Sequence, residues 1–241
     1  MPSSIAMADI VRSLCVTSFT VSALNSSVNR LRLLFLVILN SPWKTSFLWG
    51  VHFSVQGQWA IALFLHPALI AIAYATDIAL GGALPAVKVQ FSSAFGILSL
   101  LAFVFLFGPV PEEIGWRGFA LDRLQNRMTA LHASLVLGSA WALWHVPLFL
   151  IPGTFQADIG LGSARSWVLL SSMLPLSILM TWIYNNTGRS TLSAMLVHFS
   201  GNLCGALLAK STIVAAVELL LLSLAAVLVT GVWGARHLTR R

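Results

Sequence analysis

The sequence ILSLLAFVFLF at residues 97–107 is followed at once by GPVPEEIGWR at residues 108–117. The first stretch contains no charged residue and is apolar enough to lie in lipid. The second stretch places two adjacent carboxylates, Glu112 and Glu113, and an arginine, Arg117, directly after it. A charge at membrane depth costs at least about 2.5–3.5 kcal/mol, so such groups are expected to be paired, hydrated or functional. The two stretches together predict a membrane helix that leads into a polar site.

The rest of the chain has the composition of a polytopic membrane protein. Of its 241 residues, 58% are hydrophobic and only 9% are charged, whereas a soluble domain carries about 25% charged residues. The net charge is +7, and the lysines and arginines are scattered between apolar stretches, as in the loops of membrane proteins. They form no basic stripe with interleaved aromatic residues, so we expect no nucleic-acid partner.

Several windows are long and apolar enough to span a membrane, which takes about 20 residues. Five such windows lie at about 59–81, 92–111, 130–152, 166–186 and 212–234. The stretch 190–209 is also apolar but contains a polar stripe, and residues 112–128 either continue the preceding helix or lie near the interface. The sequence therefore predicts an all-α fold, a polytopic transmembrane helical bundle with about six to eight membrane segments.

The chain is expected to form one membrane domain that is preceded by an N-terminal region whose membrane segments are hard to predict. Residues 1–58 are a poorly readable N-terminal region with a possible membrane segment, and residues 59–241 form a membrane-embedded helical domain whose polar motifs lie within 95–210. By the positive-inside rule, the arginines at positions 236, 240 and 241 predict a cytoplasmic C-terminus. Counting back through the windows places Arg123, Arg127 and Arg189 inside, and the 153–165 loop, Lys88 and Lys210 outside.

Helical spacing separates the two carboxylates. Glu113 and Arg117 stand at i and i+4, so they can pair on one helix face. Glu112 is rotated by about 100° and can point elsewhere. In a soluble protein, acids just behind Pro111 would simply complement the helix dipole. Between two lipid-compatible stretches, however, we favour a functional site.

Two histidines and an asparagine in later apolar segments extend the polar set. His145 ends the motif that begins at Trp141, and a proline two residues later indicates a local break in the helix. His198 and Asn202 lie one helical turn apart on one face. Each could be structural, since His and Asn commonly hydrogen-bond between membrane helices. Together with Glu112 they predict a site assembled from three segments.

These residue types can hydrolyse a peptide bond. A carboxylate and an imidazole can take a proton from water, and a second imidazole and an amide can stabilise an oxyanion. The sequence has no Gly-x-Ser-x-Gly and no cysteine beside the histidines, which disfavours covalent catalysis. A zinc site formed by Glu112, His145 and His198 is the alternative. Because there is no His-Glu-x-x-His and Asn202 is a poor zinc ligand, we favour a mechanism with no metal cofactor.

Three motifs in order resemble the signature motifs of the CPBP family. This family contains the CAAX-processing and bacteriocin-processing intramembrane proteases, including type II CAAX prenyl endopeptidases. The resemblance covers about residues 95–210 and includes the segment 184–190, which is similar to the one that the family places before its last motif. The motifs are Glu112-Glu113-x-x-x-Arg117, Trp141-x-x-x-His145 and His198-x-x-x-Asn202.

The resemblance implies catalytic roles for four residues around a cavity within the membrane. Glu112, assisted by His145, would activate the water. His198 and Asn202 would support the site and the oxyanion.

The resemblance also implies supporting residues and a function. Glu113 and Arg117 would hold their helix in place, and Trp141 occupies a position where the family usually has phenylalanine. The implied function is that of an intramembrane (metallo)endopeptidase. The protein itself would be a multi-pass protein of the plasma membrane. It would act on prenylated or otherwise hydrophobic membrane-associated substrates, in contact with membrane lipid. The alternatives are a non-catalytic membrane scaffold, a bacteriocin-immunity protein, or a permease with a buried polar site.

Overall fold

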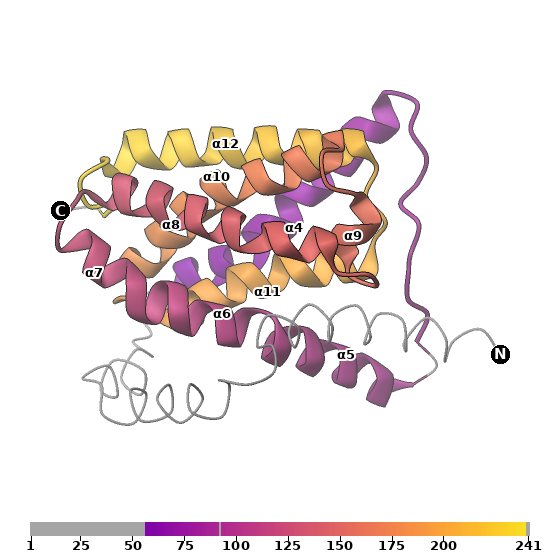
Figure 1. The fold of residues 1–241 in the computed structure, drawn as a ribbon, viewed down its shortest axis with the longest axis horizontal. Coiled ribbons are helices and arrows are strands. Elements are labelled where there is room, and N and C mark those ends of the chain that lie inside the picture. Colours follow the sequence, from indigo (N-terminus) through magenta and orange to yellow (C-terminus); the bar gives the residue numbers. More distant parts are fainter. Residues whose placement is uncertain (1–55, 92, 240–241) are drawn as a thin grey trace.

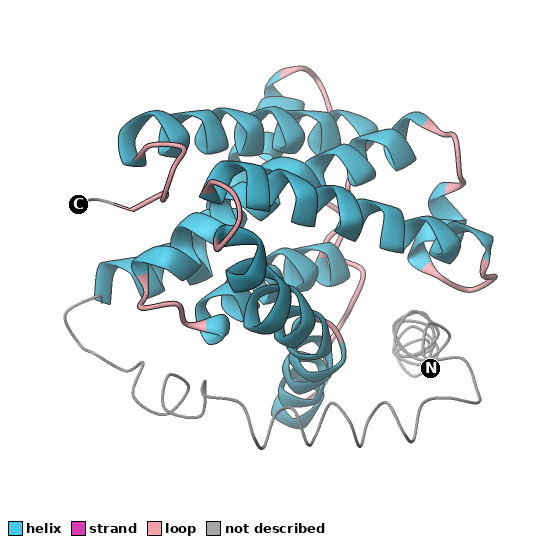
Figure 2. Cartoon of the chain, turned by 60° about the vertical axis from the view of Figure 1, so that its left-hand side comes forward, coloured by secondary structure: helices cyan, strands magenta, loops and turns pink. Residues whose placement is uncertain are grey.

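The computed structural model describes residues 56–91 and 93–239, and these residues form a bundle of helices joined by loops (Figures 1 and 2). The predicted N-terminal membrane segment falls outside the described residues. In chain order the elements are α4 (Gln56–Ala79), α5 (Ala94–Phe107), α6 (Pro109–Gly115), the π-helical η2 (Trp116–Leu121), α7 (Asp122–Gln125), α8 (Ala130–His145), the 3₁₀-helical η3 (Val146–Leu150), α9 (Phe155–Ile159), α10 (Ala164–Asn186), α11 (Thr191–Leu207) and α12 (Thr212–Trp233).

The long helices fall where the apolar windows predict them. By length and composition, five helical stretches of the described chain can cross a membrane: Gly57–Ala79, Ala94–Gln125, Ala130–Leu150, Ala164–Asn186 and Thr212–Trp233. The sixth apolar segment forms the shorter helix α11. No strand occurs within 56–91 or 93–239, which confirms the predicted all-α polytopic bundle.

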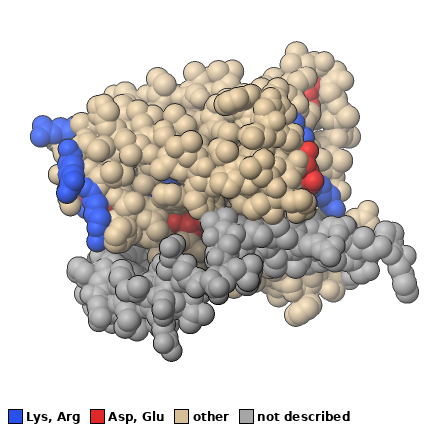
Figure 3. All heavy atoms as spheres, viewed as in Figure 1, with Lys and Arg blue, Asp and Glu red and all other residues tan. Residues whose placement is uncertain are grey.

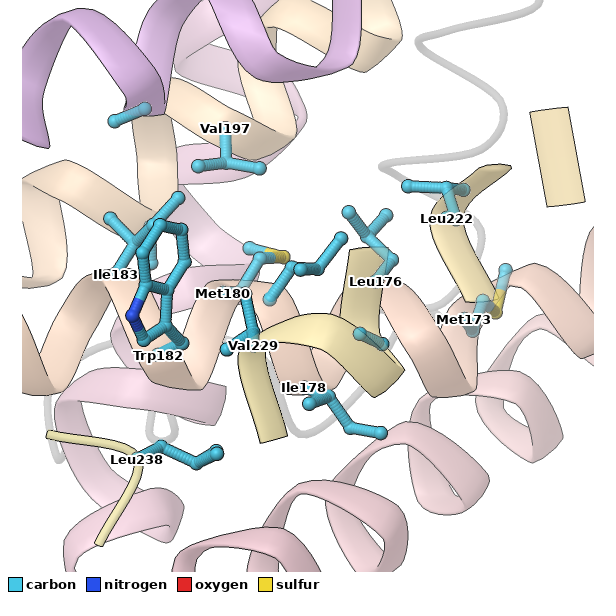
Figure 4. Packing of buried hydrophobic residues seen from close by; sticks show 14 of the residues in the cluster. Met173, Leu176, Ile178, Met180, Trp182, Ile183, Val197, Leu222, Val229 and Leu238 are labelled. Atoms are coloured by element: carbon cyan, nitrogen blue, oxygen red, sulfur yellow. The ribbon is translucent and has the colours of Figure 1, made fainter. Parts of the chain in front are cut away.

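Helix α10 forms the centre of the bundle. Of its membrane-spanning window 61% is buried, compared with 17% for the stretch that begins with α5. Its side chains Leu176, Met180 and Ile183 belong to one buried hydrophobic cluster with Val197 of α11 and Leu222 of α12 (Figure 4). Helix α10 packs against α8 and α12, and α4 packs against α11 and α12, while α5 lies along the edge of this unit (Figure 1).

A single glycine lets α8 approach α10 closely. A Cβ atom on Gly138 would lie 3.0 Å from the carbonyl oxygen of Met173 and 3.0 Å from Cβ of Ser177. Small residues at such crossings are typical of membrane helices, which associate largely by close packing. This contact brings the end of α8 that carries Trp141 and His145 next to the centre of the bundle.

The segment 184–190 fastens the C-terminal end of the described chain. Gly188 turns the backbone with a φ of +67°, a conformation that glycine adopts without steric cost. Just before it, the side-chain amide of Asn185 donates to the carbonyl of His237 at 2.9 Å, and that of Asn186 donates to the carbonyl of Leu238 at 2.6 Å. This motif is thus structural, and it ties α10 to the residues after α12.

Cationic side chains gather at the two ends of the bundle (Figure 3). At one end Arg189 pairs with Asp122 at 3.3 Å, and the backbone of Arg236 accepts a hydrogen bond from the first residue of α8. At the other end, burial lowers the pKa of Lys88 from its ordinary value, and the charges of Arg165 and Lys210 lower it further. The lysines and arginines are thus divided between the two ends of the bundle as the sequence predicts. The side of the membrane on which each group lies stays a prediction.

Candidate active site

The helix that carries the carboxylates begins after an interruption of one residue, Gly108. Helix α5 ends at Phe107, Gly108 turns the backbone, and α6 starts with Pro109 at its first position, where the missing N–H of proline costs no hydrogen bond. Residues 94–125 form one helical stretch with this break inside it. Residues 112–125 therefore continue the preceding helix, as one of the two predictions for residues 112–128 has it. The break places Glu112 in the first turn of a new helix, with Glu113 directly after it.

Glu113 and Arg117 form a fully buried ion pair. Both side chains have no solvent exposure, and Nη1 of Arg117 lies 2.9 Å from Oε2 and 3.1 Å from Oε1 of Glu113. Nη2 of Arg117 donates to Oγ of Ser177 in α10 at 3.3 Å. A buried pair is tolerated only where each charge is compensated and hydrogen-bonded. The predicted i,i+4 pairing is thus confirmed, and it also joins η2 to α10.

Glu113 has a further partner that the sequence pattern does not reveal. Nδ1 of His198, in α11, lies 2.9 Å from Oε1 of Glu113. Because an ionised carboxylate can only accept, Nδ1 of His198 carries a hydrogen. In a neutral ring, Nε2 is then the nitrogen with a free lone pair. Glu113 therefore orients His198 in addition to neutralising Arg117.

His145 is oriented in the same way by its own helix. Nδ1 of His145 lies 2.8 Å from the carbonyl oxygen of Trp141, one turn earlier in α8. A carbonyl also only accepts, so Nδ1 again carries the hydrogen and Nε2 of the neutral ring is left with a lone pair. Helix α8 ends at His145 and continues as η3, which agrees with the break predicted at Pro147. Both imidazoles thus use Nδ1 for a hydrogen bond that orients the ring.

Trp141 connects the three motifs. Its indole N–H donates to Oε2 of Glu112 at 2.8 Å. Its ring centroid lies 5.9 Å from that of His145 and 5.1 Å from that of His198, both in edge-to-face geometry. The guanidinium carbon of Arg117 lies 5.3 Å from the Trp141 centroid, within cation–π range. A phenylalanine at this position could supply the ring contacts but not the hydrogen bond.

Asn202 lies beside the break before α6. It is half-buried in α11, one turn after His198. A methyl group on Gly108 would lie 2.9 Å from Nδ2 of Asn202, so the absence of a side chain at position 108 makes room for this amide. The structure thus brings Glu112, Trp141, His145 and His198 together and places Asn202 against the residue that ends the preceding helix.

In the alternative that the sequence leaves open, Glu112, His145 and His198 would hold a zinc ion. Across 56–91 and 93–239, no three His, Cys, Asp or Glu side chains are grouped closely enough to hold a metal ion. Oε2 of Glu112 also accepts the hydrogen bond of Trp141.

Comparison with known proteins agrees with the motifs. Residues 94–204 match the family model for Rce1-like type II CAAX prenyl endopeptidases. Over 155 residues the chain is 34% identical to CAAX prenyl protease 2 of Methanococcus maripaludis, which corresponds to 62% of this chain and 56% of that protein. The chain thus matches only about 56% of the length of this relative. With its apolar helices, the chain is an integral multi-pass membrane protein, and its residues 94–204 are similar to the Rce1-like type II CAAX prenyl endopeptidases.

Proposed function

We propose that the chain is an intramembrane endopeptidase that hydrolyses a peptide bond with an activated water molecule. The observation that carries the proposal is the convergence of the three motifs on Trp141, which hydrogen-bonds Glu112 and contacts both His145 and His198. The pairing of Glu113 with Arg117 leaves Glu112 as the carboxylate free for chemistry. The match to Rce1-like endopeptidases supports the same reaction class.

In the proposed reaction Glu112, assisted by His145, takes a proton from water. The water oxygen forms a bond to the carbonyl carbon of the substrate and produces a tetrahedral intermediate. His198 and the Asn202 amide donate hydrogen bonds to its oxyanion. For this role His198 must carry hydrogens on both ring nitrogens, with Glu113 accepting the one on Nδ1. The C–N bond then breaks, and the proton taken from water passes to the leaving nitrogen.

We propose that this reaction needs no metal cofactor, because a carboxylate and an imidazole suffice to activate water at a preorganised site. Titration of the purified enzyme with a chelator tests this part of the proposal. Unchanged activity is the expected result. Loss of activity that zinc restores would overturn it and return the assignment to Glu112, His145 and His198 as ligands.

We further propose a prenylated or otherwise hydrophobic membrane-associated protein or peptide as substrate. The similarity to a CAAX prenyl protease supports this class, and the burial of the site among apolar helices favours a substrate that partitions into membrane lipid. We propose that the protein lies in the plasma membrane, with the cytoplasmic C-terminus that the distribution of arginines predicts. No nucleic acid is part of this function.

The test is cleavage of a peptide panel by the protein reconstituted in lipid. The panel contains a farnesylated CAAX peptide, the same peptide without the farnesyl group, and unrelated hydrophobic peptides. We expect the wild-type protein to cleave the farnesylated peptide and the Glu112→Ala variant to cleave none. A folded wild-type protein that cleaves no peptide would overturn the proposed activity, and cleavage of the unrelated peptides alone would overturn the substrate class.

A further inference from the structure

A second buried polar cluster lies outside the three motifs. Nε2 of His66 in α4 lies 2.7 Å from Oε1 of Glu218 in α12, and Nζ of Lys210 donates to Oε2 of Glu218 at 2.7 Å. His66 and Glu218 are each 7% exposed. None of the three residues falls within the matched range 94–204. Ionisable groups this deep among apolar helices are costly, so their presence calls for a role.

The hydrogen bonds fix the orientation of the His66 ring. Because the carboxylate of Glu218 can only accept, Nε2 of His66 carries a hydrogen. The neutral ring then has a bare Nδ1, which is buried and has no hydrogen-bond partner among the described residues. A hydrogen on that buried nitrogen would be an unsatisfied donor, so the neutral ring fits this environment. Nε2 of the imidazole is thus hydrogen-bonded to Glu218, and the opposite edge, which contains Nδ1, can pack against a neighbouring helix.

That opposite edge packs on the catalytic helix α11. A Cβ atom on Gly201 would collide with Nδ1 and Cε1 of His66, so α11 reaches this position only because residue 201 has no side chain. The next residue is Asn202, whose amide lies against Gly108. The backbone at Gly201 and Asn202 is therefore held between α4 on one side and the break before α6 on the other.

The end of α11 is tied to the same side of the bundle. Nζ of Lys88 donates to the carbonyl of Gly205 at 2.9 Å, and the hydroxyl of Tyr74 donates to the carbonyl of Ala209 at 3.0 Å. In the turn that follows, Oγ of Ser211 donates to Asp77 at 3.1 Å. These contacts limit movement of the helix end. Of the contacts along α11, the one that His66 makes with Gly201 is nearest to Asn202.

We propose that His66, held by Glu218 and Lys210, is a positioning residue that fixes α11 at Gly201 and thereby sets the place of the Asn202 amide in the active site. The proposal rests on the proposed function. An oxyanion donor acts only within a narrow range of positions, and displacement by about 1 Å can cost about 10²-fold in rate. A change at His66 therefore acts on catalysis through Asn202, without contact with the substrate.

The first test compares His66→Leu with His66→Gln. Glutamine can place an N–H donor near the position of Nε2 and keep the bond to Glu218, whereas leucine cannot. We expect His66→Leu to lower kcat about tenfold with little change in KM, and His66→Gln to retain most of the activity. His132→Leu, at the start of α8, is the matched control and keeps wild-type kcat. Equal kcat for wild type and His66→Leu would overturn the proposal.

The second test is a double-mutant cycle with Asn202→Ala. If His66 acts through Asn202, His66→Leu lowers kcat in the wild-type background but by less than about twofold in the Asn202→Ala background. Fully additive effects would show a role separate from Asn202 and would overturn the proposal.

A third test measures the contact independently of activity. We expect Gly201→Ala to lower the melting temperature in the wild-type background and to cost less in the His66→Ala background. Gly205→Ala is the matched control, because a Cβ atom there meets nothing within 4 Å. If Gly201→Ala lowered the melting temperature equally in both backgrounds, the inferred contact between His66 and Gly201 would be wrong. Failure of the folded wild type to cleave any peptide overturns the proposed function, whereas normal cleavage with additive effects overturns the positioning role alone.

Discussion

At the scale of single residues, the site depends on which nitrogen of each aromatic side chain carries a hydrogen. The indole N–H of Trp141 donates to Glu112. Nδ1 of His145 donates to the carbonyl of Trp141, and Nδ1 of His198 donates to Glu113. The side chains that are proposed to react are therefore oriented by hydrogen bonds before substrate arrives. Such preorganisation is a large part of what enzymes contribute to rate.

Replacement of Trp141 by phenylalanine tests this arrangement. Trp141→Phe keeps an aromatic ring next to both histidines but removes the hydrogen bond to Glu112. Hydrogen bonds to charged groups contribute about 1.5–3 kcal/mol, so we expect kcat to fall at least about tenfold. Trp182→Phe is the matched control, since the buried N–H of Trp182 has no acceptor among the described residues. Equal activities of the two variants would contradict the role of the Trp141 hydrogen bond.

The sequence predicts the members of the site but not all of their contacts. Glu112, His145 and His198 stand out because polar residues are rare in apolar windows. The pairing of Glu113 with Arg117 follows from helical spacing. The bond between Glu113 and His198 joins residues 85 positions apart, and only the packing of α6 against α11 creates it. Glu218 has no explanation in the sequence, and the structure supplies one in His66 and Lys210.

At the scale of helices, the buried ion pair and its hydrogen bonds join four elements. Glu113 of α6 accepts a hydrogen bond from His198 of α11, while Arg117 of η2 donates one to Ser177 of α10. Loss of the Glu113 charge leaves Arg117 buried without compensation. The ion pair is thus expected to matter for folding as well as for catalysis.

The variant Glu113→Gln separates the two carboxylates. Removal of one partner from a buried pair typically costs about 3–5 kcal/mol, so we expect a clear fall in melting temperature and in yield of folded protein. Glu112→Gln is the matched control, because Glu112 is half-buried and lies outside the ion pair. The control is expected to lose activity but to melt like wild type. Similar melting temperatures for both variants would contradict the structural role of Glu113.

The helices are predicted far better than the irregular elements between them. Long apolar windows give the spans directly, because only a helix of about 20 residues satisfies its backbone across a bilayer. The π-helical η2 and the short α9 follow from local packing and leave no such signal. The break at Gly108 and Pro109 is visible in the sequence because both residues disfavour a continuous helix.

At the scale of the whole molecule, two cationic groups at opposite ends bear on its orientation. Arg123, Arg127, Arg189 and Arg236 belong to the end where α7, the α10–α11 turn and the C-terminal segment meet. If the positive-inside rule decides orientation, this end faces the cytoplasm. The opposite end, with the loops near Gly153 and Gly160, then faces outward.

Labelling of single cysteines tests this orientation. In a protein with Cys15 and Cys204 replaced by serine, we expect a membrane-impermeant maleimide to label Leu161→Cys on intact cells. Asn126→Cys, at the exposed end of α7, is expected to react only after lysis. The reverse pattern would show that the arginine-rich end faces outward.

The central claim is that Glu112 and His145 activate one water molecule together. The most direct measurement is kcat for the wild type, Glu112→Ala, His145→Ala and the double variant, each with its melting temperature. We predict that each single change lowers kcat by at least about 10²-fold while the protein stays folded. The double variant is expected to be no slower than the slower single variant, because residues that act as one unit are not additive. A single variant that keeps more than about a tenth of the wild-type kcat, or two effects that multiply fully in the double variant, would contradict the claim.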